Sequence, residues 1–451
     1  MTSKRATTPN ILIRGGRVID PASGFDQTAD VLVADGRVAS IGRISPSEAA
    51  EAGAEVQVID AEGCIVSPGL IDIHVHLREP GHEYKETIAT GSASALNGGF
   101  TTVCCMPNTN PPLDSAAQVA FVLGQSARAD GARVFPVAAA TVGRKGEHVG
   151  ALWTLAEAGA VGFSDDGECI MDAAVMRSVL IASREAGRPF MQHCQDHSLS
   201  RGGVMNAGAL AARMGLSGWP AIAEEIIIER DVRLNRDIGC AYHVQHMSCG
   251  GSVEIVRRAR QAGQPVTAEV SPHHLLLTED ACGGYNTQAK MNPPLRGRAD
   301  IAALKEGVAD GTITVLGTDH APHSEDEKAR DFASAPFGII GLDCALPLYM
   351  RALIDDGVIG WPRLLALMTS EPAALVGLDR MGLGSLTVGG PADITVIDPD
   401  LEWTIAPEEF RSRSRNCPFF GWKVRGRALA VVVDGVLKTS RAGERVRQAA
   451  R

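Results

Sequence analysis

The sequence predicts an α/β protein made of a (β/α)8 TIM barrel with a small β-sandwich domain built from both termini. Three observations predict it. Short apolar strands alternate with Ala- and Leu-rich helical stretches in the middle of the chain, both ends are β-rich, and all twelve histidines lie between His74 and His323. We expect residues 68–383 to form the barrel, with residues 1–67 and 384–451 forming the two parts of the composite β-domain.

The two ends of the chain have similar, β-rich sequence patterns. The first contains ILIRGGRVID, ADVLVADGRVASIG and VQVIDAEGCIV, and the last contains GGPADITVIDPD and WKVRGRALAVVVDGVLKT. β-Branched residues, alternation and glycine-containing turns are typical of antiparallel strands. Because the middle of the chain lacks this pattern, the two ends are predicted to associate into one domain.

Eight candidate strands follow one another through the middle of the chain. They begin at Gly69, Thr101, Arg133, Ala160, Pro189, Ala241, Pro265 and Thr312. Continuously apolar strands separated by helices indicate a parallel sheet that is covered on both faces. Eight such units over roughly 300 residues fit a closed barrel. An open doubly wound sheet is the alternative, although no GxGxxG follows an early strand.

Composition excludes several classes of function. The net charge of −10 gives no electrostatic reason to bind nucleic acid or an anionic membrane. No apolar run approaches the roughly 20 residues of a membrane span, and no signal-peptide stretch follows Lys4 and Arg5, so a cytoplasmic location is expected. The ten cysteines form no CxxC pair and are expected to be reduced and buried.

Histidines and aspartates stand where the predicted strands end. These residues are His74 and His76 on the first strand, Asp165 and Asp166 on the fourth, His193 on the fifth, His246 on the sixth and Asp319 on the eighth. In a barrel, the carboxyl ends of the strands converge on one mouth, where catalytic groups lie. A spacing of two along a strand also directs the imidazoles of His74 and His76 to the same side.

Imidazole and carboxylate ligands without thiolate favour Zn²⁺, with Mn²⁺, Co²⁺ and Fe²⁺ as plausible substitutes. Four histidines and two carboxylates exceed the needs of one tetrahedral site, but they suffice for two metals that share a bridging group and a bridging hydroxide. The remaining histidines are expected to be ordinary core or surface residues, some of which orient the ligands. They are His82, His148, His197, His243, His273, His274 and His320.

Nine motifs carry a resemblance to a known family. They are DIHVHLREPG at Asp72, MPNTNPP at Met106, FSDDG at Phe163, HCQDHSL at His193, HVQHMS at His243, AEVSPHHLLLTED at Ala268, KMNPPLR at Lys290, GTDHAPHS at Gly317 and APFG at Ala335. With them the sequence resembles the class I bacterial dihydroorotases of the amidohydrolase superfamily over essentially its whole length. HxH alone marks only the superfamily, whereas HVHLREPG together with KMNPPLR and TDHAPH is specific to dihydroorotases.

The resemblance implies a set of metal ligands. His74, His76 and Asp319 match the ligands of a first zinc ion, and His193 and His246 match those of a second. Asp166 matches the bridging carboxylate, with Asp165 as the alternative. Many relatives, hydantoinases included, place a carboxylated lysine at the bridge, but the strand before Asp165 contains no lysine.

The substrate-binding positions of the family match Arg78, Asn108, Asn292 and His323, with backbone around Phe337 and Gly338. A guanidinium suits a substrate carboxylate because it donates to both oxygens at once. For Arg78, the alternative is a surface ion pair with Glu79 or Glu83. Asn108 and Asn292 stand in proline-punctuated loops, and without the resemblance each reads equally well as a turn residue.

The implied reaction is the reversible, zinc-dependent cyclisation of N-carbamoyl-L-aspartate to L-dihydroorotate in de novo pyrimidine biosynthesis. In the hydrolytic direction, a hydroxide held between the metals attacks the cyclic amide. Asp319 is the candidate general acid and base, taking the proton of the nucleophile and giving it to the ring nitrogen.

Two other functions compete with this one. A hydantoinase or allantoinase would share the barrel and the metals, but Arg78 followed by EPG and the missing bridge lysine argue against a hydantoinase. A non-catalytic subunit that scaffolds aspartate carbamoyltransferase would be expected to lose metal ligands, whereas all six positions are filled here. The family also raises association with aspartate carbamoyltransferase, and a homodimer is the commonest assembly to expect.

The polar stretch from Ser324 to Pro336 follows the eighth strand and precedes Phe337. It is short of apolar anchors in sequence. A mobile lid over the mouth and an ordinary surface loop are the two interpretations.

Overall fold

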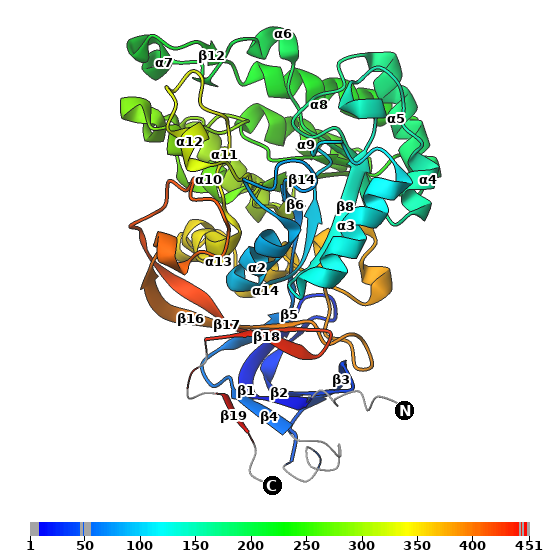
Figure 1. Cartoon of the computed structure of the whole chain (residues 1–451), viewed down its shortest axis with the longest axis vertical. Helices are drawn as coiled ribbons and strands as arrows, with labels where there is room; N and C mark the ends of the chain where they lie inside the picture. Colours follow the sequence, from blue (N-terminus) through cyan, green and yellow to red (C-terminus); the bar gives the residue numbers. More distant parts are fainter. Residues whose placement is uncertain (1–8, 46–47, 49–55, 442, 444–445, 449–451) are drawn as a thin grey trace.

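The computed structural model describes residues 9–45, 48, 56–441, 443 and 446–448. A barrel surrounded by helices occupies one end of the molecule, and a smaller sheet made from both ends of the chain occupies the other (Figure 1). The segment around Lys4 and Arg5, for which the sequence predicts no signal peptide, lies outside the described residues. None of the helices in the described ranges combines the length and apolarity needed to cross a membrane.

The eight predicted barrel strands are all present. They are β6 (Leu70–Val75), β7 (Phe100–Cys105), β8 (Arg133–Ala139), β9 (Gly162–Ser164), β10 (Phe190–Gln192), β13 (Tyr242–Val244), β14 (Val266–Val270) and β15 (Val315–Leu316). They form one parallel sheet in chain order. A parallel bridge from Val75 to His320 joins the first strand to the residues after the last one. The predicted barrel is therefore confirmed, and the open doubly wound sheet is excluded.

Amphipathic helices cover the outside of the barrel. The longer ones are α2 (Ile88–Gly98), α3 (Ala116–Ala129), α5 (Ala173–Glu185), α8 (Ile222–Asn235), α9 (Gly250–Gln261) and α11 (Arg298–Ala309). In α5, for example, Met176, Val179 and Leu180 are buried at helical spacing. The Asp172 carboxylate caps this helix by accepting hydrogen bonds from two backbone N–H groups of its first turn. All ten cysteines are buried and free, as predicted.

Strands from both ends of the chain form a nine-stranded sheet. Its members are β1 (Asn10–Asp20), β2 (Phe25–Ala34), β3 (Arg37–Gly42), β4 (Val56–Asp60), β5 (Ile65–Pro68), β16 (Ile394–Thr404), β17 (Lys423–Val433), β18 (Val436–Ser440) and β19 (Val446–Gln448). The pairing register of β1 shifts between Ile13 and Gly16, and its two halves pair with β4 and β5 respectively. The sheet branches at this register shift in β1, and buried apolar side chains from its strands form one core.

Strand β5 runs almost directly into the first barrel strand, β6. Only Gly69 separates them, and its backbone N–H donates to Asp393 O at 2.8 Å. A Cβ at this position would lie 2.1 Å from the Thr101 hydroxyl oxygen, so a larger residue does not fit. Because β5 pairs with β16, the strand that leads to His74 and His76 is anchored in the sheet.

The stretch after the eighth strand contains a short helix, α12 (Glu325–Lys328), which is capped by Ser324. The sequence suggested few anchors here, but Phe332 is buried at 3% exposure. The Lys290 ammonium donates hydrogen bonds of 2.6 Å to both Phe332 O and Ala335 O. A distant lysine that binds backbone carbonyls therefore anchors this stretch, in addition to the few apolar side chains that its sequence contains. Its opening as a lid stays a prediction.

Candidate metal centre and active site

One small cavity of about 160 Å³ lies at the carboxyl ends of the barrel strands. Its lining includes every site residue expected from the sequence except His74, which is fully buried beside it. The cavity-lining members of that set are His76, Arg78, Asn108, Asp166, His193, His246, Asn292, Asp319, His323, Phe337 and Gly338. Barrel closure thus brings together residues from His76 to Gly338 in the sequence.

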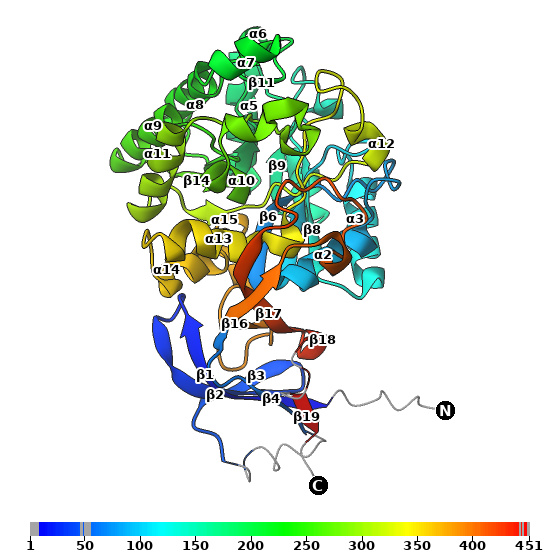
Figure 2. The ribbon, with the colours of Figure 1, turned by 90° about the vertical axis from the view of Figure 1, so that its left-hand side faces the viewer.

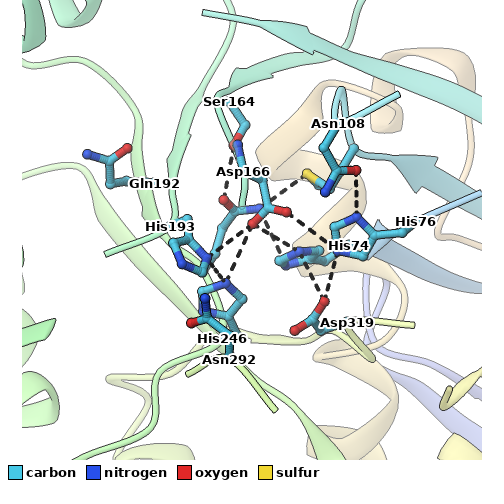
Figure 3. A network of polar contacts seen from close by, with 12 residues as sticks. His74, His76, Asn108, Ser164, Asp166, Gln192, His193, His246, Asn292 and Asp319 are labelled. Carbon is cyan, nitrogen blue, oxygen red and sulfur yellow. Dashed lines mark hydrogen bonds and ion pairs between the residues drawn. The ribbon is translucent and has the colours of Figure 1, made fainter. Parts of the chain in front are cut away.

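Asp166 lies at the centre of four imidazoles (Figure 3). Its Oδ1 is 3.5 Å from the nearest ring nitrogen of each of three histidines, His74, His193 and His246. Its Oδ2 is 3.4 Å from His76 Nε2. The second carboxylate lies nearest to one pair of histidines: Asp319 Oδ1 is 3.0 Å from His76 Nε2 and 3.6 Å from His74 Nε2. A ring nitrogen of His246 also lies within 4.8 Å of this carboxylate. The cluster therefore has two halves that meet at Asp166.

This donor set fits divalent cations. His74 Nε2 and Asp166 Oδ1 are buried and have no hydrogen-bond partner, which is costly unless something else binds them. His193 Nδ1 and His246 Nε2 face each other at 2.8 Å. Two atoms bound tetrahedrally to one zinc at 2.0–2.1 Å lie roughly 3.3 Å apart, close to the spacings around Asp166. The residues are spaced as metal ligands are.

Both carboxylates are held in the ionised form that a metal needs. Burial alone would raise the pKa of Asp166, but the charge of His74 and the close imidazoles of His193 and His246 hold that pKa well below its usual value. Burial also acts to raise the pKa of Asp319, but His74, His76 and His246 outweigh it and lower that pKa to about 2.

A buried carboxylate orients His74. Glu269, on β14, accepts a hydrogen bond from His74 Nδ1, which leaves Nε2 free to face Asp166. The other oxygen of Glu269 is 3.1 Å from His243 Nε2. Glu269 is completely buried. Glu269 was not among the residues predicted from the sequence, although a lone carboxylate inside an apolar barrel strand is a signal that it has a partner.

Amides orient two more ligands. Gln195 Oε1 lies 2.8 Å from His193 Nε2, so the Nδ1 of that ring faces Asp166. The same oxygen accepts a hydrogen bond of 3.0 Å from Asn292 Nδ2. Asn108 Oδ1 lies 2.9 Å from His76 Nδ1. Gln195 was missed in the sequence, where its spacing of two from His193 was the available signal.

The structure separates the two neighbouring aspartates after β9. The Asp165 carboxylate accepts from the backbone N–H groups of Ala140 and Thr141 at 3.0 Å, away from the histidines. Arg144 donates to Asp166 O at 2.6 Å and holds the turn from outside. Asp166 rather than Asp165 is consequently the residue that faces the imidazoles.

Arg78 reaches the cavity from the loop after β6. Its Nε donates to Pro322 O at 3.1 Å, and its Nη2 lies 3.5 Å from His323 Nε2. Glu79 instead accepts from Ile88 N and Glu83 from Gly81 N, and among the described residues no ion pair joins either to Arg78. The alternative of a surface ion pair is not what the structure shows.

His323 is neutral at physiological pH. Burial lowers its pKa, and the charges of Arg78 and Lys85 lower it further, to about 3, against the opposing hydrogen bond with Glu327. Its Nδ1 lies 3.3 Å from Glu327 Oε2. His323 therefore offers Nε2 to the cavity without adding a positive charge to that of Arg78.

Three of the site residues have left-handed backbone conformations. The φ angles of Arg78, His246 and Asp319 are 61°, 32° and 47°. Non-glycine residues pay a conformational cost in this region, and such residues cluster at functional sites because the surrounding structure holds them there. The observation supports the cavity as the functional centre.

Comparison with known proteins agrees with the geometry. The family model described as "Dihydro-orotase-like" matches residues 63–252. A dihydroorotase from Syntrophotalea carbinolica is 48% identical over 94% of this chain and 98% of its own length. A dihydroorotase from Geobacter sp. is 47% identical over the same shares. Among solved structures, the fold is similar to an L-hydantoinase from Arthrobacter aurescens, with a TM-score of 0.83, 25% identity, and 96% of this chain and 97% of that one covered.

Glu269→Gln is expected to weaken zinc binding about 10- to 100-fold, because the amide no longer fixes the orientation and basicity of His74. Competition with a chromophoric chelator at constant pH measures the affinity. Glu254→Gln is the matched control, since the carboxylate of Glu254 is 55% exposed on α9. Equal zinc affinity in the two variants would contradict the role assigned to Glu269.

Proposed function

Since the chain belongs to the dihydroorotase family, we propose that it interconverts N-carbamoyl-L-aspartate and L-dihydroorotate, the cyclisation step of de novo pyrimidine biosynthesis. It is a metal-dependent cyclic amidohydrolase. One observation carries the choice of substrate: a single small cavity joins the Asp166-centred cluster to the guanidinium of Arg78. The cavity thus combines a site for a reacting amide with a cation for a carboxylate.

We assign one Zn²⁺ to His74, His76 and Asp319 and a second to His193 and His246, with Asp166 bridging them. The nitrogen and oxygen donors favour zinc, and the two halves of the cluster support the number. When bound, the metals supply a hydroxide nucleophile near neutral pH and a Lewis acid for the amide carbonyl. The motifs that flank the ligands support the proposal that the chain is a class I member of the family.

Asp319 moves the proton in this proposal. In the hydrolytic direction, its carboxylate takes a proton from the attacking nucleophile and gives it to the ring nitrogen as the C–N bond breaks. In the synthetic direction, the carboxylate takes a proton from the ureido nitrogen as that nitrogen attacks the carboxyl carbon. It then gives this proton to the departing carboxyl oxygen, which leaves as hydroxide as the C–O bond breaks. The low pKa of Asp319 keeps it ionised and ready to accept.

Arg78 binds the free carboxylate of the substrate. Burial lowers the pKa of its guanidinium to about 10, so that it remains protonated at neutral pH. Asn108, Asn292 and His323 surround the same cavity. Asn292 Oδ1 is buried without a partner, so it can accept a hydrogen bond from a ring N–H. Backbone around Phe337 and Gly338 also lines this cavity.

The two competing functions, a hydantoinase and a non-catalytic scaffold, account less well for the residues of the site. A hydantoinase acting on rings with neutral side chains has no need for the cation of Arg78, although a hydantoinase shares the fold. A scaffold without catalysis has no use for six convergent ligands and their buried supports such as Glu269. Homodimer formation, association with aspartate carbamoyltransferase and a cytoplasmic location stay predictions from the sequence.

Interconversion of L-dihydroorotate and N-carbamoyl-L-aspartate by purified, zinc-loaded protein tests the proposal directly. Turnover in both directions that a chelator abolishes and zinc restores is expected. Absence of turnover by fully metallated protein, repeated with aspartate carbamoyltransferase added, would refute it.

Asp319→Asn is expected to lower kcat by at least about 1,000-fold, because an amide cannot accept the proton that must reach the ring nitrogen. The comparison is made at matched zinc content, measured by elemental analysis. Normal turnover by metal-loaded Asp319→Asn protein would show that another group carries the proton.

Arg78→Ala is expected to reduce kcat/KM for dihydroorotate by about 100-fold or more, since a charge-assisted pair with the substrate carboxylate is lost. Zinc content should be unchanged because Arg78 binds no metal in this assignment. Arg78→Lys should recover only part of the loss, as an ammonium lacks the planar fork of a guanidinium. Unaltered kinetics in Arg78→Ala would remove the residue from the substrate site.

A further inference from the structure

The connection between β16 and β17 leaves the terminal sheet and runs along the barrel (Figures 1 and 2). Two buried acidic residues of the barrel hold it there. Glu86 accepts hydrogen bonds from the Ser412 hydroxyl and, at 3.1 Å, from Arg413 N. Asp343 accepts from Arg411 N at 2.8 Å. The connection between β16 and β17 is therefore fixed to the barrel by these hydrogen bonds.

That segment contains Asn416, which is 2% exposed. Its Nδ2 donates to Ala321 O at 2.9 Å and to Gly338 O at 3.0 Å, and its Oδ1 accepts from His323 N at 3.1 Å. Its backbone carbonyl accepts from Ile340 N at 3.0 Å. The side-chain amide of Asn416 therefore hydrogen-bonds only to backbone groups in these contacts. Those groups belong to two loops, one that carries His323 and one that carries Gly338.

These two loops approach each other closely where Asn416 joins them. A Cβ on Gly338 would lie 2.6 Å from Ala321 O and 2.7 Å from His323 Cδ2, so only glycine fits. Gly338 O also accepts a hydrogen bond of 3.1 Å from the buried ammonium of Lys328. With a contact this tight, a small change in separation of the loops displaces the imidazole of His323 from its place beside Arg78.

We propose that Asn416 is a positioning residue for the substrate: by bonding to both loops, it fixes His323 and Gly338 at the separation that the substrate requires. It lies outside the barrel sequence and does not line the cavity. The inference rests on the proposed function, because it assigns His323 and Gly338 to binding of the dihydroorotate carboxylate and ring.

Asparagine is required at this position for a chemical reason. An aspartate is nearly the same size and still accepts from His323 N, but it replaces the donor with an oxygen that faces Ala321 O and Gly338 O. Repulsion between these oxygens pushes the loops apart. Asn416→Asp is consequently the most specific perturbation, and Asn416→Ala is a second variant that removes the bonds without adding repulsion.

The test is steady-state kinetics with L-dihydroorotate on zinc-loaded wild-type, Asn416→Asp and Asn416→Ala proteins. We expect KM to rise about tenfold or more in both variants, while kcat changes less than about threefold and zinc content is unchanged. In a His323→Ala background, the effect of Asn416→Asp on kcat/KM should shrink by at least about threefold, because the residue acts partly through His323.

Asn235→Asp is the matched control. Asn235 is also fully buried and uses its amide on backbone groups, accepting from Cys240 N and donating to Cys240 O, but it lies before β13 at the opposite end of the barrel. An equal rise of KM in Asn235→Asp, an unchanged KM in Asn416→Asp, or effects that are independent of His323 would each overturn the inference. Inactive wild-type protein would instead count against the proposed function.

Discussion

The structure depends on one carboxylate that is buried among imidazoles. Asp166 is 2% exposed, and nitrogens of four histidines lie 3.4–3.5 Å from its oxygens. A buried charge is tolerated only when it is paired, so Asp166 constrains everything that surrounds it. Those histidines come from three different barrel strands, and a closed parallel barrel is the arrangement that delivers all of them to one point.

The imidazoles around Asp166 are in turn oriented by other buried side chains, and these are surrounded by further polar contacts. Glu269, Gln195 and Asn108 each bind the far nitrogen of a ligand imidazole and so determine which nitrogen faces inward. Beyond them, Arg78 and the neutral imidazole of His323 line one part of the cavity, which we propose to be the binding site of the substrate carboxylate. The terminal sheet participates as well, because it anchors the first barrel strand and extends a segment to the loops of the mouth. Catalysis and fold therefore share the same buried polar contacts.

Much of this was predictable from the sequence because local pattern determined it. Eight apolar strands, each followed by a helix, predicted the barrel, and strand-end residues such as His74 and His246 predicted the metal cluster. The choice between Asp165 and Asp166 was not readable from spacing alone, since both follow a three-residue strand and only backbone donors at Ala140 and Thr141 separate them. The anchoring by Lys290 was also hidden, because a side chain that binds distant backbone carbonyls leaves no periodic signal in sequence.

The central claim is that Asp166 joins two metal ions held by opposite pairs of histidines. Anomalous scattering from crystals of zinc-loaded protein, collected on both sides of the zinc absorption edge, tests it most directly. The account predicts two zinc peaks in each chain, one beside His74 and His76 and one beside His193 and His246, with the carboxylate of Asp166 between them. A single peak at full zinc occupancy, or two peaks of which neither contacts Asp166, would contradict it.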